Sequence, residues 1–251
     1  MALYHRIYRV ALVLLLAAVA HAITNQDNHV LLASDNIAIY TEAIRLDPNY
    51  VSAYQQRGYT YGKKGEYDKA IEDYTKAIQL KPDYVRAYYN RGIAYEKRGK
   101  RNKAIKDFTQ AIRLNPNDAA AYRNRGDIYR KKGDYDKAIE DFTEVIRLKP
   151  NYAVVYRKRG NAYIRVGEHD KVIADYTEVI RLNPDDTRAY IERSLAYQRK
   201  GDYDKAIESY TEFIRLDPNN AEGYSLRGWV YKNKGDLQKA KADFDKAKSL
   251  R

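Results

Sequence analysis

The sequence predicts an all-α fold built from stacked pairs of antiparallel helices, and the spacing of its prolines and glycines is the main reason. All six prolines lie 34 residues apart, at Pro48, Pro82, Pro116, Pro150, Pro184 and Pro218. All but two of the 13 glycines, Gly62 and Gly223, follow the same step in two series. Between these breaks, apolar residues recur at helical spacing. A fixed period of this length indicates a repeat architecture.

Each repeat predicts two helices, as residues 51–84 illustrate. Gly65 follows two lysines and is suited to ending the first helix in a left-handed conformation. Asp68 lies where an acid suits the N-terminus of the second helix, and Pro82 lies just past its end. The second helix has an apolar stripe formed by Ala70, Ile71, Tyr74, Ala77, Ile78 and Leu80.

The repeated pattern resembles the tetratricopeptide repeat. In residues 51–84 the matching positions are Tyr54, Gly58, Tyr61, Ala70, Tyr74 and Pro82. The resemblance covers residues 51–251 and implies a right-handed superhelical solenoid of antiparallel helix pairs. We divide the chain into repeat 1 (51–84), repeat 2 (85–118), repeat 3 (119–152), repeat 4 (153–186), repeat 5 (187–220) and a shorter repeat 6 (221–251). Residues 23–50 are expected to form a lead and a capping helix, and Lys241, Asp245 and Lys248 should make the last helix a polar cap.

Residues 1–22 predict a secretory signal peptide. Arg6 and Arg9 precede an apolar run over residues 10–20, and residues 20–22 (Ala-His-Ala) form a small-x-small cleavage pattern. The run is shorter than the roughly 20 residues that a membrane-spanning helix needs. We therefore expect export to a periplasm, a secretory lumen or the outside of the cell. The alternative is an uncleaved membrane anchor, and only this alternative would attach the chain to a membrane.

The composition argues against catalysis. The chain has no cysteine, which excludes disulfides, thiolate metal sites and a cysteine nucleophile. Its histidines are isolated, and the sequence shows no metal-ligand spacing, nucleophile elbow or phosphate-binding glycine loop. We expect no enzymatic activity, no cofactor and no metal. The formal net charge of +12 favours acidic partners.

An arginine precedes the first glycine position of every repeat, where the family usually has leucine. The row is Arg57, Arg91, Arg125, Arg159, Arg193 and Arg227. An aspartate follows each one sixteen residues later, except that Ser209 follows Arg193, and in that repeat Ser194 also replaces the glycine. We expect ion pairs between the two helices of a repeat. A row of ligand-binding arginines is the alternative.

The resemblance implies that the first helices of successive repeats line a groove that binds peptides. Amides occupy one groove position in three successive repeats (Gln56, Asn90 and Asn124) and could hold an extended backbone, although a solvated polar groove explains them equally well. Basic residues in the middle, Arg123, Arg157 and Lys158, would attract an acidic segment. The apolar candidates at the two ends are Tyr59, Tyr89 and Ile93, then Ile191, Leu195 and Trp229.

The function predicted from these residues is a non-catalytic scaffold or adaptor for a protein or peptide with an acidic segment. Two alternatives remain: a basic groove that binds nucleic acid, against which the predicted export argues, and a structural protein that associates with itself. Arg157 and Asn161 match the first two roles of the carboxylate clamp found in some family members. Glu192 stands where that clamp needs its next asparagine, so we do not expect chaperone-tail binding of that kind.

Overall fold

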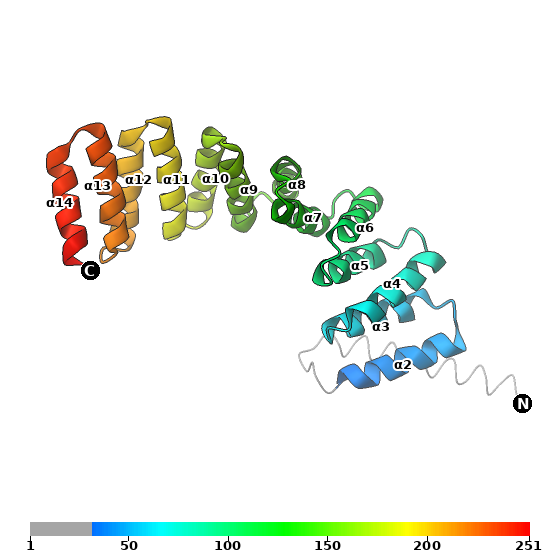
Figure 1. The fold of residues 1–251 in the computed structure, drawn as a ribbon. Helices are drawn as coiled ribbons and strands as arrows, with labels where there is room; N and C mark the ends of the chain where they lie inside the picture. The colour runs from blue at the N-terminus through cyan, green and yellow to red at the C-terminus, as the bar shows by residue number, and fades with distance from the viewer. Residues whose placement is uncertain (1–31) are drawn as a thin grey trace, which may run out of the picture. The chain divides into compact units, whose positions relative to one another are not determined.

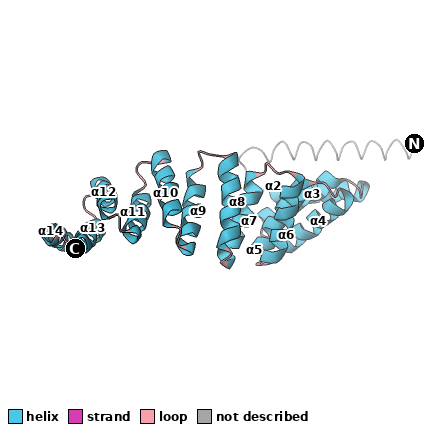
Figure 2. Cartoon of the chain, turned by 90° about the horizontal axis from the view of Figure 1, so that it is seen from above, coloured by secondary structure: helices cyan, strands magenta, loops and turns pink. Residues whose placement is uncertain are grey.

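The computed structural model describes residues 32–251, so the predicted signal peptide (1–22) and the lead as far as residue 31 lie outside the described residues. Over the described range the chain forms 13 α-helices joined by short loops (Figures 1 and 2). Successive helices pack as antiparallel pairs, which confirms the predicted all-α repeat fold. No described helix is both long and apolar enough to cross a membrane.

The chain divides into two halves after Ile128, within α7, and each half is described by itself. The helices of the N-terminal half are α2 (Leu32–Leu46), α3 (Val51–Lys63), α4 (Tyr67–Leu80), α5 (Val85–Lys97), α6 (Arg101–Leu114) and the start of α7 (Ala119–Lys132). The C-terminal half continues with α8 (Tyr135–Leu148), α9 (Ala153–Val166), α10 (His169–Leu182), α11 (Thr187–Lys200), α12 (Tyr203–Leu216), α13 (Ala221–Lys234) and α14 (Leu237–Ser249). The division into repeats remains one made on the sequence, and we use it to number equivalent positions.

The first helix of each pair ends as the glycine spacing predicts. Gly65 has a φ of +78°, a left-handed conformation that costs glycine little, and the next residue, Glu66, donates its backbone N–H to the carbonyl of Tyr61 at 2.9 Å. Five further glycines of that series also have positive φ, at Gly99, Gly133, Gly167, Gly201 and Gly235. The left-handed residue turns the chain back, so that the second helix lies against the first.

In several of the helix pairs an aromatic ring of the second helix packs against a glycine of the first. At Gly58 an added Cβ would lie 2.9 Å from the ring of Tyr74, and at Gly92 it would lie 3.0 Å from the ring of Phe108. Glycine at positions 58 and 92 therefore allows the ring this close approach. Phe108 is fully buried, and burial of such a ring contributes roughly 1.5–3 kcal/mol to folding.

The terminal helices α2 and α14 both bury small or aromatic residues against the array. Near the N-terminus, Tyr40 and Ala43 of α2 are buried and pack with Ala53 of α3. In α14 the inward residues Ala240 and Ala247 are buried. The three polar residues at the expected cap positions, Lys241, Asp245 and Lys248, are exposed.

Candidate functional site

The arginine row forms ion pairs within the repeats. Arg57 donates to both carboxylate oxygens of Asp73, at 2.9 and 2.7 Å, and its side chain is only 17% exposed. The same two-bond pairing joins Arg91 to Asp107, Arg159 to Asp175 and Arg227 to Asp243. Burial raises the pKa of the Asp73 carboxyl, while the hydrogen bonds from Arg57 act in the opposite direction.

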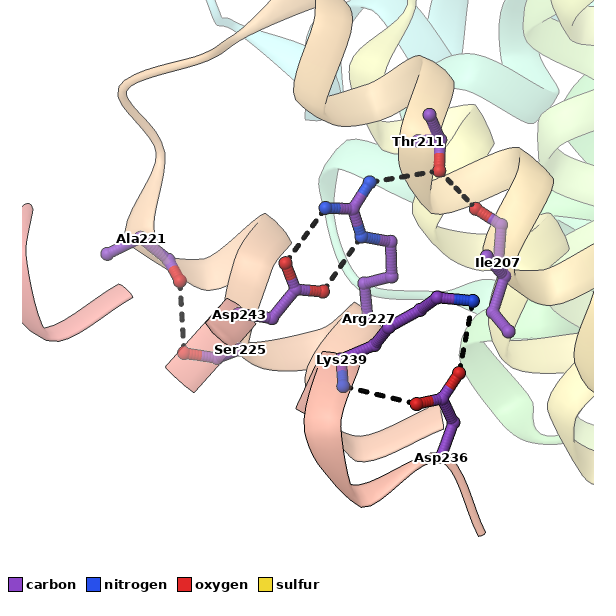
Figure 3. Close-up of polar contacts among 8 residues, drawn as sticks. All are labelled: Ile207, Thr211, Ala221, Ser225, Arg227, Asp236, Lys239 and Asp243. Atoms are coloured by element: carbon purple, nitrogen blue, oxygen red, sulfur yellow. Dashed lines mark hydrogen bonds and ion pairs between the residues drawn. The ribbon is translucent and has the colours of Figure 1, made fainter. Parts of the chain in front are cut away.

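Each guanidinium of this kind also reaches the neighbouring helix pair. Arg227 donates a third hydrogen bond, at 3.0 Å, to the hydroxyl of Thr211 on the preceding helix, and Thr211 in turn donates to the carbonyl of Ile207 (Figure 3). The guanidinium lies 5.9 Å from the ring centres of both Tyr224 and Tyr231. Equivalent threonine bonds hold Arg57, Arg91, Arg125 and Arg159. These arginines are therefore engaged in contacts that build the array rather than presented to a ligand.

Repeat 5 has a different contact at this position. Arg193 donates to the hydroxyl of Ser209 at 3.0 Å, and the hydroxyl of the fully buried Ser194 donates to the carbonyl of Tyr190 at 2.7 Å. In repeat 1, a Cβ added to Gly58 would lie 3.1 Å from the Cβ of Asp73. Serine has a Cβ just as aspartate does, so this close approach does not explain why Ser209 replaces the aspartate in the repeat that has Ser194.

The predicted amides are in part engaged by tyrosines of the chain itself. Asn124 donates its amino group to the hydroxyl of Tyr89 at 3.1 Å, and the Tyr89 ring meets Phe108 edge-on at 5.8 Å. The side-chain oxygen of Asn161 accepts a hydrogen bond from Tyr176 at 2.8 Å. Gln56 also has a contact within the chain. Peptide binding by the three amides Gln56, Asn90 and Asn124 stays a prediction. Asn124 already forms a hydrogen bond within the chain.

The predicted basic residues also have partners within the chain. Arg157 forms an ion pair with Asp186, which itself caps the N-terminus of α11 by accepting from the backbone N–H of Ala189. Arg123 and Lys158 have intramolecular contacts as well. The positive charge of Arg157 is thus partly compensated, which the sequence did not indicate because Asp186 is 29 residues from Arg157.

Three predicted residues meet in one pocket of the N-terminal half, which we call the repeat-1 pocket. Tyr59, Asn90 and Ile93 line it, and its volume is about 290 Å³. It lies between α3, α4 and α5. Its other lining residues are Gly62, Lys63, Tyr67, Tyr74, Ala94 and Lys97.

The repeat-1 pocket combines an apolar lining with positive charge. Tyr59 is 44% exposed, and the ammonium of Lys63 lies 5.4 Å from the centre of its ring. Lys97 is exposed at the pocket and, like Lys63, forms no ion pair within the described range. Burial raises the pKa of the Tyr74 phenol, so this hydroxyl adds no negative charge to the pocket. The arrangement is suited to an apolar group that is accompanied by negative charge.

The equivalent location in repeat 4 is nearly filled. This second pocket, which we call the repeat-4 pocket, has a volume of about 20 Å³. It is lined by Ile164, His169, Glu192, Leu195, Ala196 and Arg199, of which Leu195 was a predicted binding residue. A volume this small is close to that of a single water molecule.

The remaining apolar candidates lie apart from these pockets. Ile191 is partly buried and packs against the core of repeats 5 and 6. Trp229 is 51% exposed, its ring meets Phe244 edge-on at 5.5 Å, and the ammonium of Lys232 lies 4.7 Å from the ring centre. Within residues 32–251, no three His, Asp or Glu side chains are grouped so as to hold a metal ion.

Sequence models of the tetratricopeptide repeat match most of the chain. Those described as "Tetratricopeptide repeat" match residues 39–72, 89–153, 153–186 and 221–251, and one described as "TPR repeat" matches residues 58–99 and 195–235. The chain belongs to the tetratricopeptide repeat family. Tetratricopeptide arrays are generally non-catalytic scaffolds for protein interaction.

Solved tetratricopeptide structures resemble this chain. The crystal structure of MamA protein is 30% identical, covers 68% of this chain and 94% of its own, and has a TM-score of 0.62. Part of a repeat protein from Cytophaga hutchinsonii is 20% identical, with 93% and 95% covered and a TM-score of 0.75. YrrB, titled "a TPR protein with an unusual peptide-binding site", is 21% identical, with 71% and 92% covered and a TM-score of 0.64. The last two show the fold alone. Comparison with curated protein sequences gives no match.

Part of the repeat-1 pocket was missed by reasoning from the tetratricopeptide pattern. Lys63 was interpreted as a cation at a helix C-terminus, and Tyr74 as core. Gly62 was noted only as a glycine outside the two regular series, and this irregularity was the one signal that could have located the pocket.

Proposed function

We propose that this tetratricopeptide protein is a non-catalytic scaffold that binds a protein segment containing acidic residues. The observation that supports this most strongly is the repeat-1 pocket, where Tyr59, Asn90 and Ile93 form an open site next to two lysines. Asn90 supplies an amide that can donate to a peptide carbonyl and accept from a peptide N–H. No carboxylate lines the pocket, so its charge favours an acidic ligand.

The arginine contacts weigh against the nucleic-acid alternative. Four arginines of the repeated row, Arg57, Arg91, Arg159 and Arg227, each face an aspartate. They are therefore poorly placed to contact phosphates. The predicted export also argues against nucleic-acid binding, and we propose that the chain acts outside the cytoplasm. The N-terminal sequence of the purified protein tests this proposal. A start near Ile23 supports export, and an intact Met1 contradicts cleavage.

Peptide display on the full chain tests the proposed function. We expect selection from a random library to enrich acidic sequences, and the selected peptides to lose affinity as salt rises, because exposed charges are screened. A matched selection on a Lys63→Glu, Lys97→Glu double variant should lose the acidic preference. Both lysines are exposed at helix ends, so this variant should remain folded, which its helical circular dichroism and melting temperature would verify.

Two results would contradict the proposal. One is the absence of any peptide enrichment together with strong, sequence-independent binding of single-stranded RNA that falls steeply with salt, which would favour nucleic acid. The other is a mass that grows with concentration in sedimentation without peptide enrichment, which would favour self-association.

A further inference from the structure

Gly62 has no packing role in the fold. A Cβ built at this position would meet nothing closer than the Tyr74 hydroxyl at 3.9 Å and Ala70 at 4.0 Å. Gly62 lies within α3 and is not among the glycines with positive φ. The other irregular glycine, Gly223, differs, because a Cβ there would lie 2.8 Å from the ring of Phe213. Glycine weakens a helix, so its presence at position 62 needs another explanation.

The equivalent position in the other repeats has a side chain. It is occupied by Glu96, Arg130, Ile164, Gln198 and Lys232. Where Ile164 stands, the pocket between the neighbouring helices shrinks to about 20 Å³, compared with about 290 Å³ beside Gly62. The missing side chain at Gly62 therefore contributes to the space in the repeat-1 pocket.

The size and lining of this space restrict what can fill it. An apolar protein cavity of about 150 Å³ holds a benzene molecule, so the repeat-1 pocket has room for one aromatic or branched aliphatic side chain. Tyr67, Tyr74 and Ile93 provide apolar contacts, and Tyr59 can stack on an inserted ring. The repeat-4 pocket has Glu192 where the repeat-1 pocket has Asn90, so only the repeat-1 pocket lacks a lining carboxylate.

We propose that the repeat-1 pocket, opened by Gly62, anchors one leucine- or phenylalanine-sized side chain of a bound peptide, with acidic residues beside it facing Lys63 and Lys97. This inference rests on the proposed function and makes it more specific. The apolar side chain selects the ligand by shape, and the two lysines select acidic flanks over basic ones.

Capped heptapeptides made of aspartate and glutamate around one central residue test the proposal. The central residue is alanine, leucine, phenylalanine or lysine, and binding to the full chain is followed by fluorescence polarisation. We expect the leucine and phenylalanine peptides to bind at least tenfold more tightly than the alanine peptide. Gly62→Ile should reduce this ratio to near one, because isoleucine fills the pocket as Ile164 does in repeat 4, while weak binding of the alanine peptide persists.

Gln198→Ile is the matched control, since it places the same side chain at the equivalent position of repeat 5 and should leave the ratio unchanged. The inference is overturned if wild type does not distinguish the four peptides, if the ratio survives Gly62→Ile, or if Gln198→Ile abolishes it equally. In these cases acidic peptides still bind, and the proposed function stands. If no acidic peptide binds wild type and display enriches none, the proposed function itself fails. Binding that appears only after removal of residues 1–31 would show that the chain's own N-terminal segment covers the pocket, which also overturns the inference.

Discussion

The repeat-1 and repeat-4 pockets occupy equivalent positions in the repeat and yet differ more than tenfold in volume, about 290 against 20 Å³. Both lie between the first helices of adjacent repeats and the second helix that joins them. Gly62 lines one pocket and Ile164 the other, and Glu192 of the repeat-4 pocket stands where the repeat-1 pocket has Asn90. In a protein made of near-identical units, a binding site is thus created where one unit departs from the pattern.

Beneath the two pockets the supporting structure is the same. Arg57 pairs with Asp73 in repeat 1 as Arg159 pairs with Asp175 in repeat 4, with carboxylate side chains only 6% and 3% exposed. The repeats therefore differ in the side chains offered to a ligand while their internal ion pairs remain alike. Substitutions in the shared ion pairs should therefore change the stability of both repeats alike, whereas substitutions at Gly62 or Ile164 should affect one repeat only.

The largest effect should come from breaking the shared ion pair. Asp73→Ala and Asp175→Ala should each lower the free energy of unfolding by about 3–5 kcal/mol, because a mostly buried arginine is left without its carboxylate. Urea unfolding measures this. Asp68→Ala, which removes an exposed ion pair with Arg98, is the control and should cost no more than about 1 kcal/mol. If only one of Asp73→Ala and Asp175→Ala lowered the free energy of unfolding by this amount, the ion pairs of the two repeats would not be energetically equivalent.

An intermediate effect should follow from emptying the repeat-4 pocket. Ile164→Gly removes a partly buried side chain and places glycine within α9, so we expect a loss of about 2–3 kcal/mol in the free energy of unfolding. Binding of the phenylalanine heptapeptide at the repeat-1 pocket should be unchanged, as polarisation would show. A variant as stable as wild type would mean that Ile164 does not support the fold at this position.

The smallest effect should be a gain in stability. Gly62→Ala should raise the free energy of unfolding by about 0.4–1 kcal/mol, since the methyl group meets no atom closely and the unfolded chain loses freedom. Gly58→Ala is the matched control in the same helix and should destabilise, because its Cβ would lie 2.9 Å from the Tyr74 ring. Calorimetric melting of the two variants should show shifts of opposite sign.

Reasoning from the sequence succeeded for features that recur and was weaker for features that occur once. The helix pairs and the pairing of Arg57 with Asp73 follow from a pattern repeated along the chain, so each copy supports the others. Tyr59, Asn90 and Ile93 were selected as variable positions, and the structure brings these three together. The compensation of Arg157 by Asp186 depends on a contact between a helix and the cap of the next one, and no periodic signal encodes it.

Five of the six arginines in the row donate a hydrogen bond to a threonine, and these bonds bear on how the array melts. Arg91 binds Asp107 in its own repeat and Thr75 in the preceding one, so a single side chain links two units. In a one-dimensional chain of units, such a link contributes to the coupling between neighbours as well as to the intrinsic stability of one unit. Fraying of one helix pair then releases a charged donor of the next. Local opening should consequently spread along each half in steps of a whole repeat.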